Sequence, residues 1–139
     1  MARTGGRDLD ALITFLEGRA RMPFAWGRSR NDCISFGLGA VKAQTGVDLL
    51  AGSGLRWNSA LSAARVLDRL GGMDAAISAR LAVIPVAMAH RGDVGVVQGV
   101  NGPLLVVVEG DTVVGPDLNG CQRLPRSALI KTWTLGDGK

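Results

Sequence analysis

The residues best suited to chemistry lie in the segment Trp26-Gly27-Arg28-Ser29-Arg30-Asn31-Asp32-Cys33. An apolar run follows it, and we predict a buried helix from Cys33 to Thr45, with Asp32 as its N-cap and Gly46 as its C-terminal cap. A thiol in the first turn of a helix faces unpaired N–H groups and the positive end of the helix dipole, which lower its pKa. Cys33 is therefore a candidate nucleophile, because the thiolate is the form that attacks carbonyl carbons.

Each residue of this segment also has an ordinary structural interpretation. Cys33 could be a small buried apolar side chain, and Asp32 could be either a helix cap or a helper of the thiol. Trp26 could line a groove for a glycan or a peptide beside Cys33, together with Asp32 and Asp93, or it could pack in the core, as we expect for Trp133. The sequence leaves these alternatives open.

The chain has one histidine, His90, just before Arg91-Gly92-Asp93. It is the one imidazole that could act as a general base for Cys33, and its alternative is an ordinary loop histidine. Asp93 could orient that imidazole, or it could cap N–H groups of its own turn. We treat Cys121 as structural. Two cysteines and one histidine match no metal-binding spacing, so we expect neither a metal ion nor a cofactor.

The elements that must position these residues divide the chain into a helical first half and a strand-rich second half. Apolar residues at helical spacing predict helices over residues 9–18, 33–45, 59–70 and 73–80. Short β-branched runs predict strands over residues 93–97, 104–108, 112–114 and 129–135. Gly37 and Gly39, inside a predicted helix, indicate close approach by another part of the chain. The predicted fold class is α+β, with an antiparallel sheet, in a single domain over residues 1–139.

Length and composition exclude several classes of protein. The chain has 139 residues, of which 47% are hydrophobic and 20% charged, so it is not a disordered protein. No apolar run approaches the ~18 residues of a membrane span, and the polar residues Met1 to Asp10 predict that there is no secretory signal. The net charge is +4, but carboxylates sit among the early arginines and aromatic residues are only 4%, so we expect no nucleic-acid partner.

The order of several motifs resembles the NlpC-type cell-wall peptidases, which are papain-like cysteine enzymes that cut the stem peptides of peptidoglycan. Within them, it is most similar to a short phage-associated branch of domains of unknown function encoded among tail genes. The motifs are Pro23-Phe24-Ala25-Trp26-Gly27, Asp32-Cys33, Thr45-Gly46-Val47-Asp48, Gly71-Gly72, Arg91-Gly92-Asp93-Val94 and Thr132-Trp133. The resemblance implies a papain-like fold, with the helix that starts at Cys33 packed on a small antiparallel sheet and Cys33 in the position of the nucleophile.

The resemblance also implies where the base should be. In active relatives it is a histidine at the start of the next strand, and that position falls on Leu104 or a neighbour. The third polar residue should lie around Thr112 to Val114, where only Thr112 is polar. The catalytic histidine is therefore missing from its expected place.

Two hypotheses for function follow from the resemblance. In the first, the chain is a tail-tip component of a bacteriophage or gene-transfer agent, with a structural or assembly role. Its partners would be other tail-tip proteins, such as hub and distal-tail proteins, and it would contact the host cell wall. It would be made in the bacterial cytoplasm and carried in the virion. The alternative is an active peptidoglycan endopeptidase, with Cys33 as nucleophile and His90 or a water as base. A weaker third hypothesis is a site that binds wall peptides without cutting them.

Overall fold

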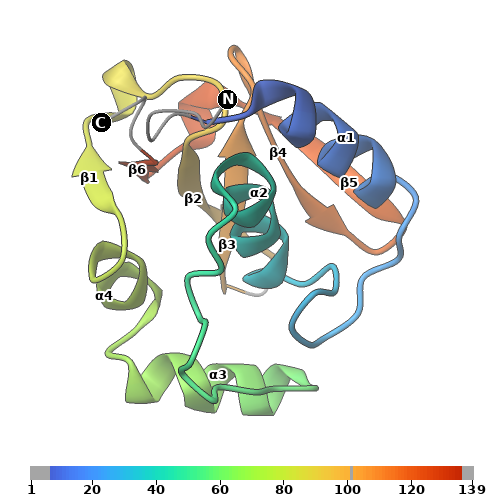
Figure 1. Ribbon diagram of the computed structural model, residues 1–139, viewed down its shortest axis with the longest axis vertical. Helices are drawn as coiled ribbons and strands as arrows, with labels where there is room; N and C mark the ends of the chain where they lie inside the picture. Colours follow the sequence, from blue (N-terminus) through green and yellow to red (C-terminus); the bar gives the residue numbers. More distant parts are fainter. Residues whose placement is uncertain (1–6, 101, 136–139) are drawn as a thin grey trace.

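The computed structural model describes residues 7–100 and 102–135, which form helices first and a sheet afterwards (Figure 1). The helices of this part of the chain are α1 (Leu9–Arg19), α2 (Ser35–Thr45), α3 (Ala60–Arg69) and α4 (Met73–Ser78). Two short 3-10 turns are η1 (Val86–Met88) and η2 (Arg126–Ala128). The α+β class is confirmed.

The sheet has six strands, in the order β1-β6-β2-β3-β4-β5. The strands are β1 (Ala82–Ile84), β2 (Val94–Gly99), β3 (Gly102–Val108), β4 (Thr112–Asp117), β5 (Gly120–Pro125) and β6 (Lys131–Thr134). All neighbouring strands pair antiparallel. Four of the strands were predicted from their β-branched runs, whereas β1 and β5 were not.

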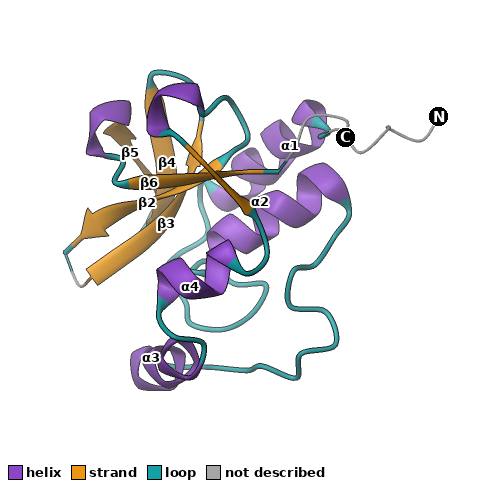
Figure 2. Cartoon of the chain, turned by 90° about the vertical axis from the view of Figure 1, so that its left-hand side faces the viewer, coloured by secondary structure: helices purple, strands orange, loops and turns teal. Residues whose placement is uncertain are grey.

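Strand β3 is the centre of the core, and its two faces enter different apolar clusters. Leu105 and Val107 join the cluster that includes residues of α1 and α2. The residues between and beside them, Leu104, Val106 and Val108, join a second cluster on the opposite face of the sheet. Successive residues of a strand point to opposite faces, so burial on both sides explains the continuous apolar run. Figure 2 shows α1 and α2 side by side on one side of the sheet.

The second face is covered by the segments around the 3-10 turns. Ala128 and Leu129 pack against its cluster, which also contains Ala89. The guanidinium group of Arg126 fixes this cover, because its Nη2 donates to the carbonyl oxygens of Val86 at 2.8 Å and Ala89 at 2.6 Å. The connection from β5 to β6 therefore crosses the sheet and closes this face.

Helix α2 is the central helix, and its two interior glycines are both close to another part of the chain, as predicted. A Cβ atom at Gly37 would lie 2.6 Å from Cγ of Leu105, and one at Gly39 would lie 2.7 Å from the ring of Phe15. Such distances are too short for real contacts, so both positions need glycine for α2 to pack against β3 and α1.

The start of α2 differs from the prediction. The helix begins at Ser35, not at Cys33, and Cys33 lies in the turn before it. Asp32 nevertheless caps this end as predicted, because its Oδ1 accepts hydrogen bonds from the N–H groups of Ile34 at 2.9 Å and Ser35 at 2.6 Å, and its carbonyl oxygen accepts one from Phe36 at 3.3 Å. Cys33 and Ile34 form the turn between this cap and the helix. At the other end, Gly46 is the C-cap as predicted, with φ 77°.

Candidate functional site

The side chain of Asp32 holds the segment that precedes α2 in place. Its side chain is fully buried, and Oδ2 accepts hydrogen bonds from the N–H of Gly27 at 2.9 Å and from Nε1 of Trp57 at 2.8 Å. With the two bonds to the start of α2, all four lie within 3.0 Å. A carboxylate whose oxygens are saturated in this way has no acceptor capacity left for a substrate. Asp32 therefore holds three segments together and lines no groove, contrary to its assignment as a groove residue.

Cys33 lies between the helix and the sheet. Its carbonyl oxygen accepts a hydrogen bond from the N–H of Leu105 at 3.0 Å, and its side chain packs against both apolar clusters. Burial, followed by the negative charge of Asp32, raises the pKa of the Cys33 thiol to about 11. This direction is opposite to the one expected for a thiol in the first turn of a helix. The helix N–H groups that should have stabilised a thiolate are bonded to Asp32 instead.

The position that the resemblance gives to the base is next to Cys33, and it is apolar. The bond from Leu105 to the Cys33 carbonyl brings the middle of β3 against the cysteine. Leu104 is buried in the second cluster, against which Cys33 packs. A leucine can neither accept nor donate a proton, so this neighbour supplies no acid–base function to the thiol.

His90 lies at the other end of β3 and pairs with Asp93. Nδ1 of His90 is 3.1 Å from Oδ2 of Asp93, whose Oδ1 is 2.8 Å from Nη2 of Arg7. The adjacent Gly92 donates to the carbonyl of Val108, three residues along β3 from the Cys33 contact at Leu105. Three residues of a strand span about 10 Å. The structure therefore does not bring His90 and Cys33 together.

Asp93 is also fully buried, so it is not part of a groove either. Besides the His90 ring, its Oδ2 accepts a hydrogen bond from the His90 backbone N–H at 2.9 Å. Arg7 donates in addition to the carbonyl of Arg91 at 2.7 Å. Asp93 thus ties the start of β2 to the residue that precedes α1, whereas the His90 ring is largely exposed.

Trp26 is the one predicted groove residue that does line a groove. It is half-buried and packs edge-to-face on Phe24, with ring centroids 5.0 Å apart. It borders an open hollow of about 900 Å³. The other lining residues are Gly27, Arg28, Ser29, Arg30, Arg56, Trp57, Asn58 and Ser62. Trp57 and Trp133 are core residues, and Trp133 is only 1% exposed.

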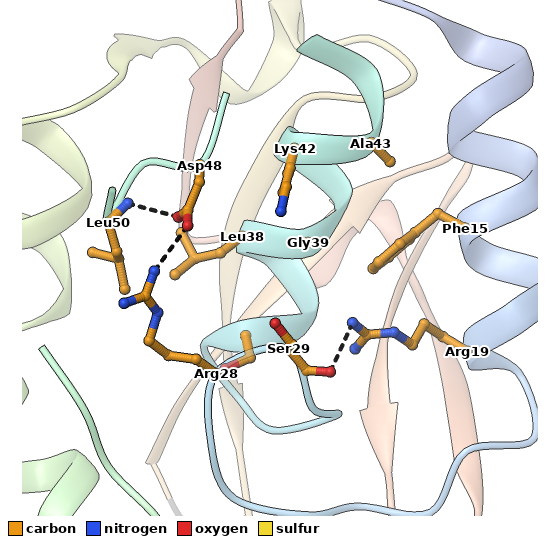
Figure 3. A pocket seen from close by; sticks show the side chains of 11 residues that line it. Phe15, Arg19, Arg28, Ser29, Leu38, Gly39, Lys42, Ala43, Asp48 and Leu50 are labelled. Carbon is orange, nitrogen blue, oxygen red and sulfur yellow. Dashed lines mark hydrogen bonds and ion pairs between the residues drawn. The ribbon is translucent and has the colours of Figure 1, made fainter. Parts of the chain in front are cut away.

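A second hollow, of about 410 Å³, shares Arg28 and Ser29 with the first, and Figure 3 shows the residues that line it. Its apolar part is formed mainly by Phe15, Leu38 and Leu50, and three cations, Arg19, Arg28 and Lys42, surround it. Cys33 lines neither hollow. We refer to the two hollows, which share Arg28 and Ser29, as the basic groove.

The basic groove was missed in the sequence because charge was judged along the chain. Aspartates alternate with the early arginines in the sequence, but the fold separates them. Asp32 is buried under the loop, and Asp8 caps the far end of α1. Lys42 and Arg56 reach the groove from more distant segments. The one available signal was the Arg-Ser-Arg triplet at residues 28–30, directly before the cap.

The geometry defines a small α+β domain with a partly buried cysteine of raised pKa and an open basic groove. Residues 7–135 match a family described as a domain of unknown function (DUF6950), and the chain belongs to that family. No curated protein and no solved structure matches the chain. Over residues 7–100 and 102–135, no helix has the length and apolar character needed to cross a bilayer. In those same ranges, histidine, cysteine and carboxylate side chains form no group of three or more that could hold a metal ion.

Proposed function

We propose that the chain is a tail-tip component of a bacteriophage or gene-transfer agent, in which a papain-like domain serves assembly and not peptide cleavage. The resemblance of its ordered motifs to the phage-associated NlpC-type branch supports the tail-tip part of this proposal. The position of Cys33 between α2 and the middle of β3, with its carbonyl oxygen bonded to the N–H of Leu105, supports the papain-like part of this proposal.

The observation that carries the non-catalytic part is the environment of Cys33. Its pKa is raised to about 11, so the thiol stays protonated at neutral pH. The neighbouring strand offers Leu104 where a base would be needed, and His90 is bonded to Asp93 at a distant end of the sheet. Cysteine peptidases need both a thiolate and a proton donor for the leaving amine.

The test is deletion of the gene from a phage or prophage that encodes the chain, followed by complementation. The wild-type gene and a Cys33→Ala variant are each supplied in trans, and a Cys121→Ala variant is the matched control. We expect all three to restore tailed particles that deliver DNA, with the protein located at the tail tip by immunogold labelling.

Two results would overturn the proposal. Absence of the protein from purified particles would exclude the tail-tip role. If Cys33→Ala restored intact particles that bind cells but fail to deliver DNA, while Cys121→Ala delivered normally, the peptidase hypothesis would replace the assembly role.

A further inference from the structure

The basic groove gathers cations from four separate segments of the fold. Arg19 is the last residue of α1, Arg28 and Arg30 belong to the loop before α2, Lys42 lies in the last turn of α2, and Arg56 precedes α3. Among the lining residues, Asp48 is the one carboxylate. The buried Asp32 lies beneath the loop, and its acceptor capacity is used by its four hydrogen bonds.

Two of these cations build the groove. Arg19 lies over the ring of Phe15, 4.7 Å from its centroid, and Nη1 donates to the carbonyl of Arg30 at 2.6 Å. Arg28 forms an ion pair of 2.8 Å with Asp48. These contacts hold the loop between α1 and the segment after α2. Ser29 is in the left-handed region, with φ 65°, which is uncommon for a residue other than glycine.

The other three cations have no partner in the part of the chain that the structure describes. The side chains of Arg30, Lys42 and Arg56 are exposed, and none makes a hydrogen bond or an ion pair with another described residue. Lys42 borders the smaller hollow, Arg30 and Arg56 border the larger one, and Arg28 borders both. Such a row of positive charge favours an extended ligand with several negative charges.

The groove also has an apolar part, and this narrows the class of ligand. The apolar floor of the smaller hollow consists of the lining residues Phe15, Leu38 and Leu50 (Figure 3). A single-stranded nucleic acid would instead need aromatic faces on which its bases can stack. Trp57 is buried with Nε1 bonded to Asp32, and Trp26 is packed on Phe24. An apolar side chain flanked by carboxylates complements this surface better.

We propose that the basic groove binds an acidic polypeptide segment of a partner protein, with carboxylates on Arg30, Lys42 and Arg56 and an apolar side chain on the floor formed by Phe15, Leu38 and Leu50. Arginine suits this role because its planar guanidinium group binds carboxylates through two parallel hydrogen bonds. The inference does not depend on a virion location, and it would stand if the tail-tip proposal failed.

The test is fluorescence anisotropy with the full chain and a short fluorescein-labelled peptide rich in glutamate that carries one leucine. We expect saturable binding that weakens as salt is raised from about 50 to about 300 mM, because screening shortens the range of the charges. A peptide with glutamine in place of glutamate should not bind detectably. A peptide with serine in place of the leucine should bind at least about threefold more weakly, since one buried apolar side chain is worth more than ~1 kcal/mol.

The two matched double variants lower the net charge by the same amount, one inside the groove and one outside it. Arg30→Glu combined with Lys42→Glu should weaken binding at least about tenfold. Arg65→Glu combined with Arg69→Glu, at two exposed positions that do not line the groove, should leave the affinity within about twofold of the wild type. Circular dichroism of all variants checks that they fold, which is expected because none of these four side chains makes a hydrogen bond or an ion pair with another described residue.

Three outcomes would overturn the inference. Equal weakening by the groove and control variants would mean that the peptide responds only to net charge. Equal affinities for the leucine and serine peptides would contradict the apolar part of the proposed site. Tighter binding of a single-stranded oligothymidine of the same charge than of the peptide, at the same salt concentration, would assign the groove to nucleic acid.

Discussion

The segment from Trp26 to Ser35 separates two regions of opposite character. On one side, Cys33 is packed between two apolar clusters with a raised thiol pKa. On the other side, the basic groove is open to solvent and carries three cations with no partner among the described residues. A buried thiolate would lose its hydration, whereas an exposed guanidinium or ammonium group keeps it. Cysteine, the residue type that often carries chemistry, thus lies in an unreactive environment. The surface suited to binding a ligand is the basic groove, on the opposite side of the segment.

Asp32 joins these two regions, and its removal should have the largest effect. In Asp32→Ala, the N–H groups of Gly27, Ile34 and Ser35 and the indole N–H of Trp57 lose their acceptor. We expect the free energy of unfolding to fall by about 3–4 kcal/mol, because buried donors would be left unsatisfied. Urea denaturation measures this free energy of unfolding.

Asp48→Ala is the matched control, because this aspartate is only half-buried and serves one ion pair and one backbone N–H. Its cost should be about 1 kcal/mol. If both substitutions lowered the free energy of unfolding equally, the conclusion that Asp32 holds the two regions together would be contradicted.

The alkylation rate of Cys33 directly tests the contrast between the two regions. With a pKa of about 11, its thiolate fraction rises tenfold per pH unit through the neutral range and levels off only near pH 11. Alkylation by iodoacetamide at about pH 8 should therefore be roughly 100-fold slower than that of free cysteine. Mass spectrometry in a Cys121→Ala background measures the rate.

His90→Ala should leave this alkylation rate unchanged, because the imidazole pairs with Asp93 and not with the thiol. A reactive plateau below about pH 7 that disappears in His90→Ala would show a thiolate–imidazolium pair. That result would break the contrast between the two regions.

The two glycines of α2 face the two regions separately. Gly37→Ala forces a methyl group against the buried Leu105, and we expect a net loss of about 2 kcal/mol from overpacking. Gly39→Ala meets the ring of Phe15, which is half-buried at the edge of the groove and can turn outward, so its cost should be smaller. The gain in helix propensity, about 1 kcal/mol, offsets part of both. Thermal unfolding measures the stability of both variants. A larger loss of stability in Gly39→Ala than in Gly37→Ala would contradict this prediction.

The smallest effect is expected at the rim of the groove. Arg28→Ala breaks the ion pair with Asp48, whose members are both about one third exposed. Exposed pairs of this kind contribute less than about 1 kcal/mol, and salt screens them. Urea denaturation at low and high salt should show a loss that shrinks as salt is raised. A loss that does not change with salt would mean that Arg28 acts through packing.

Much of the fold could be predicted because local signals decide it. Asp8 caps α1 through its side chain, and the turn at Gly110-Asp111 joins β3 to β4. The strand β5 escaped prediction because its residues, Gly120–Pro125, are mixed in polarity, and pairing with β4 makes it a strand. The strand β1 has three residues and depends on β6, which lies far away in the sequence.

The candidate site was harder to predict because its properties depend on burial. The sequence placed Cys33 beside a helix start with Asp32 as its cap, but it could not show that two apolar clusters would pack against the thiol and raise its pKa. The basic groove depends on which of the neighbouring charges the fold buries, and spacing along the chain does not contain that information.

The position of β6 has a consequence for synthesis of the chain. It is the last strand in sequence, yet it lies inside the sheet, between β1 and β2. Until the ribosome has released residues 131–134, β1 has no neighbour and the edge of β2 is open. Translation therefore completes the hairpins β2–β3–β4–β5 first, and the helical half can be joined to them through β1 only at the end. Folding of the whole domain therefore has to wait until residues 131–134 have left the ribosome.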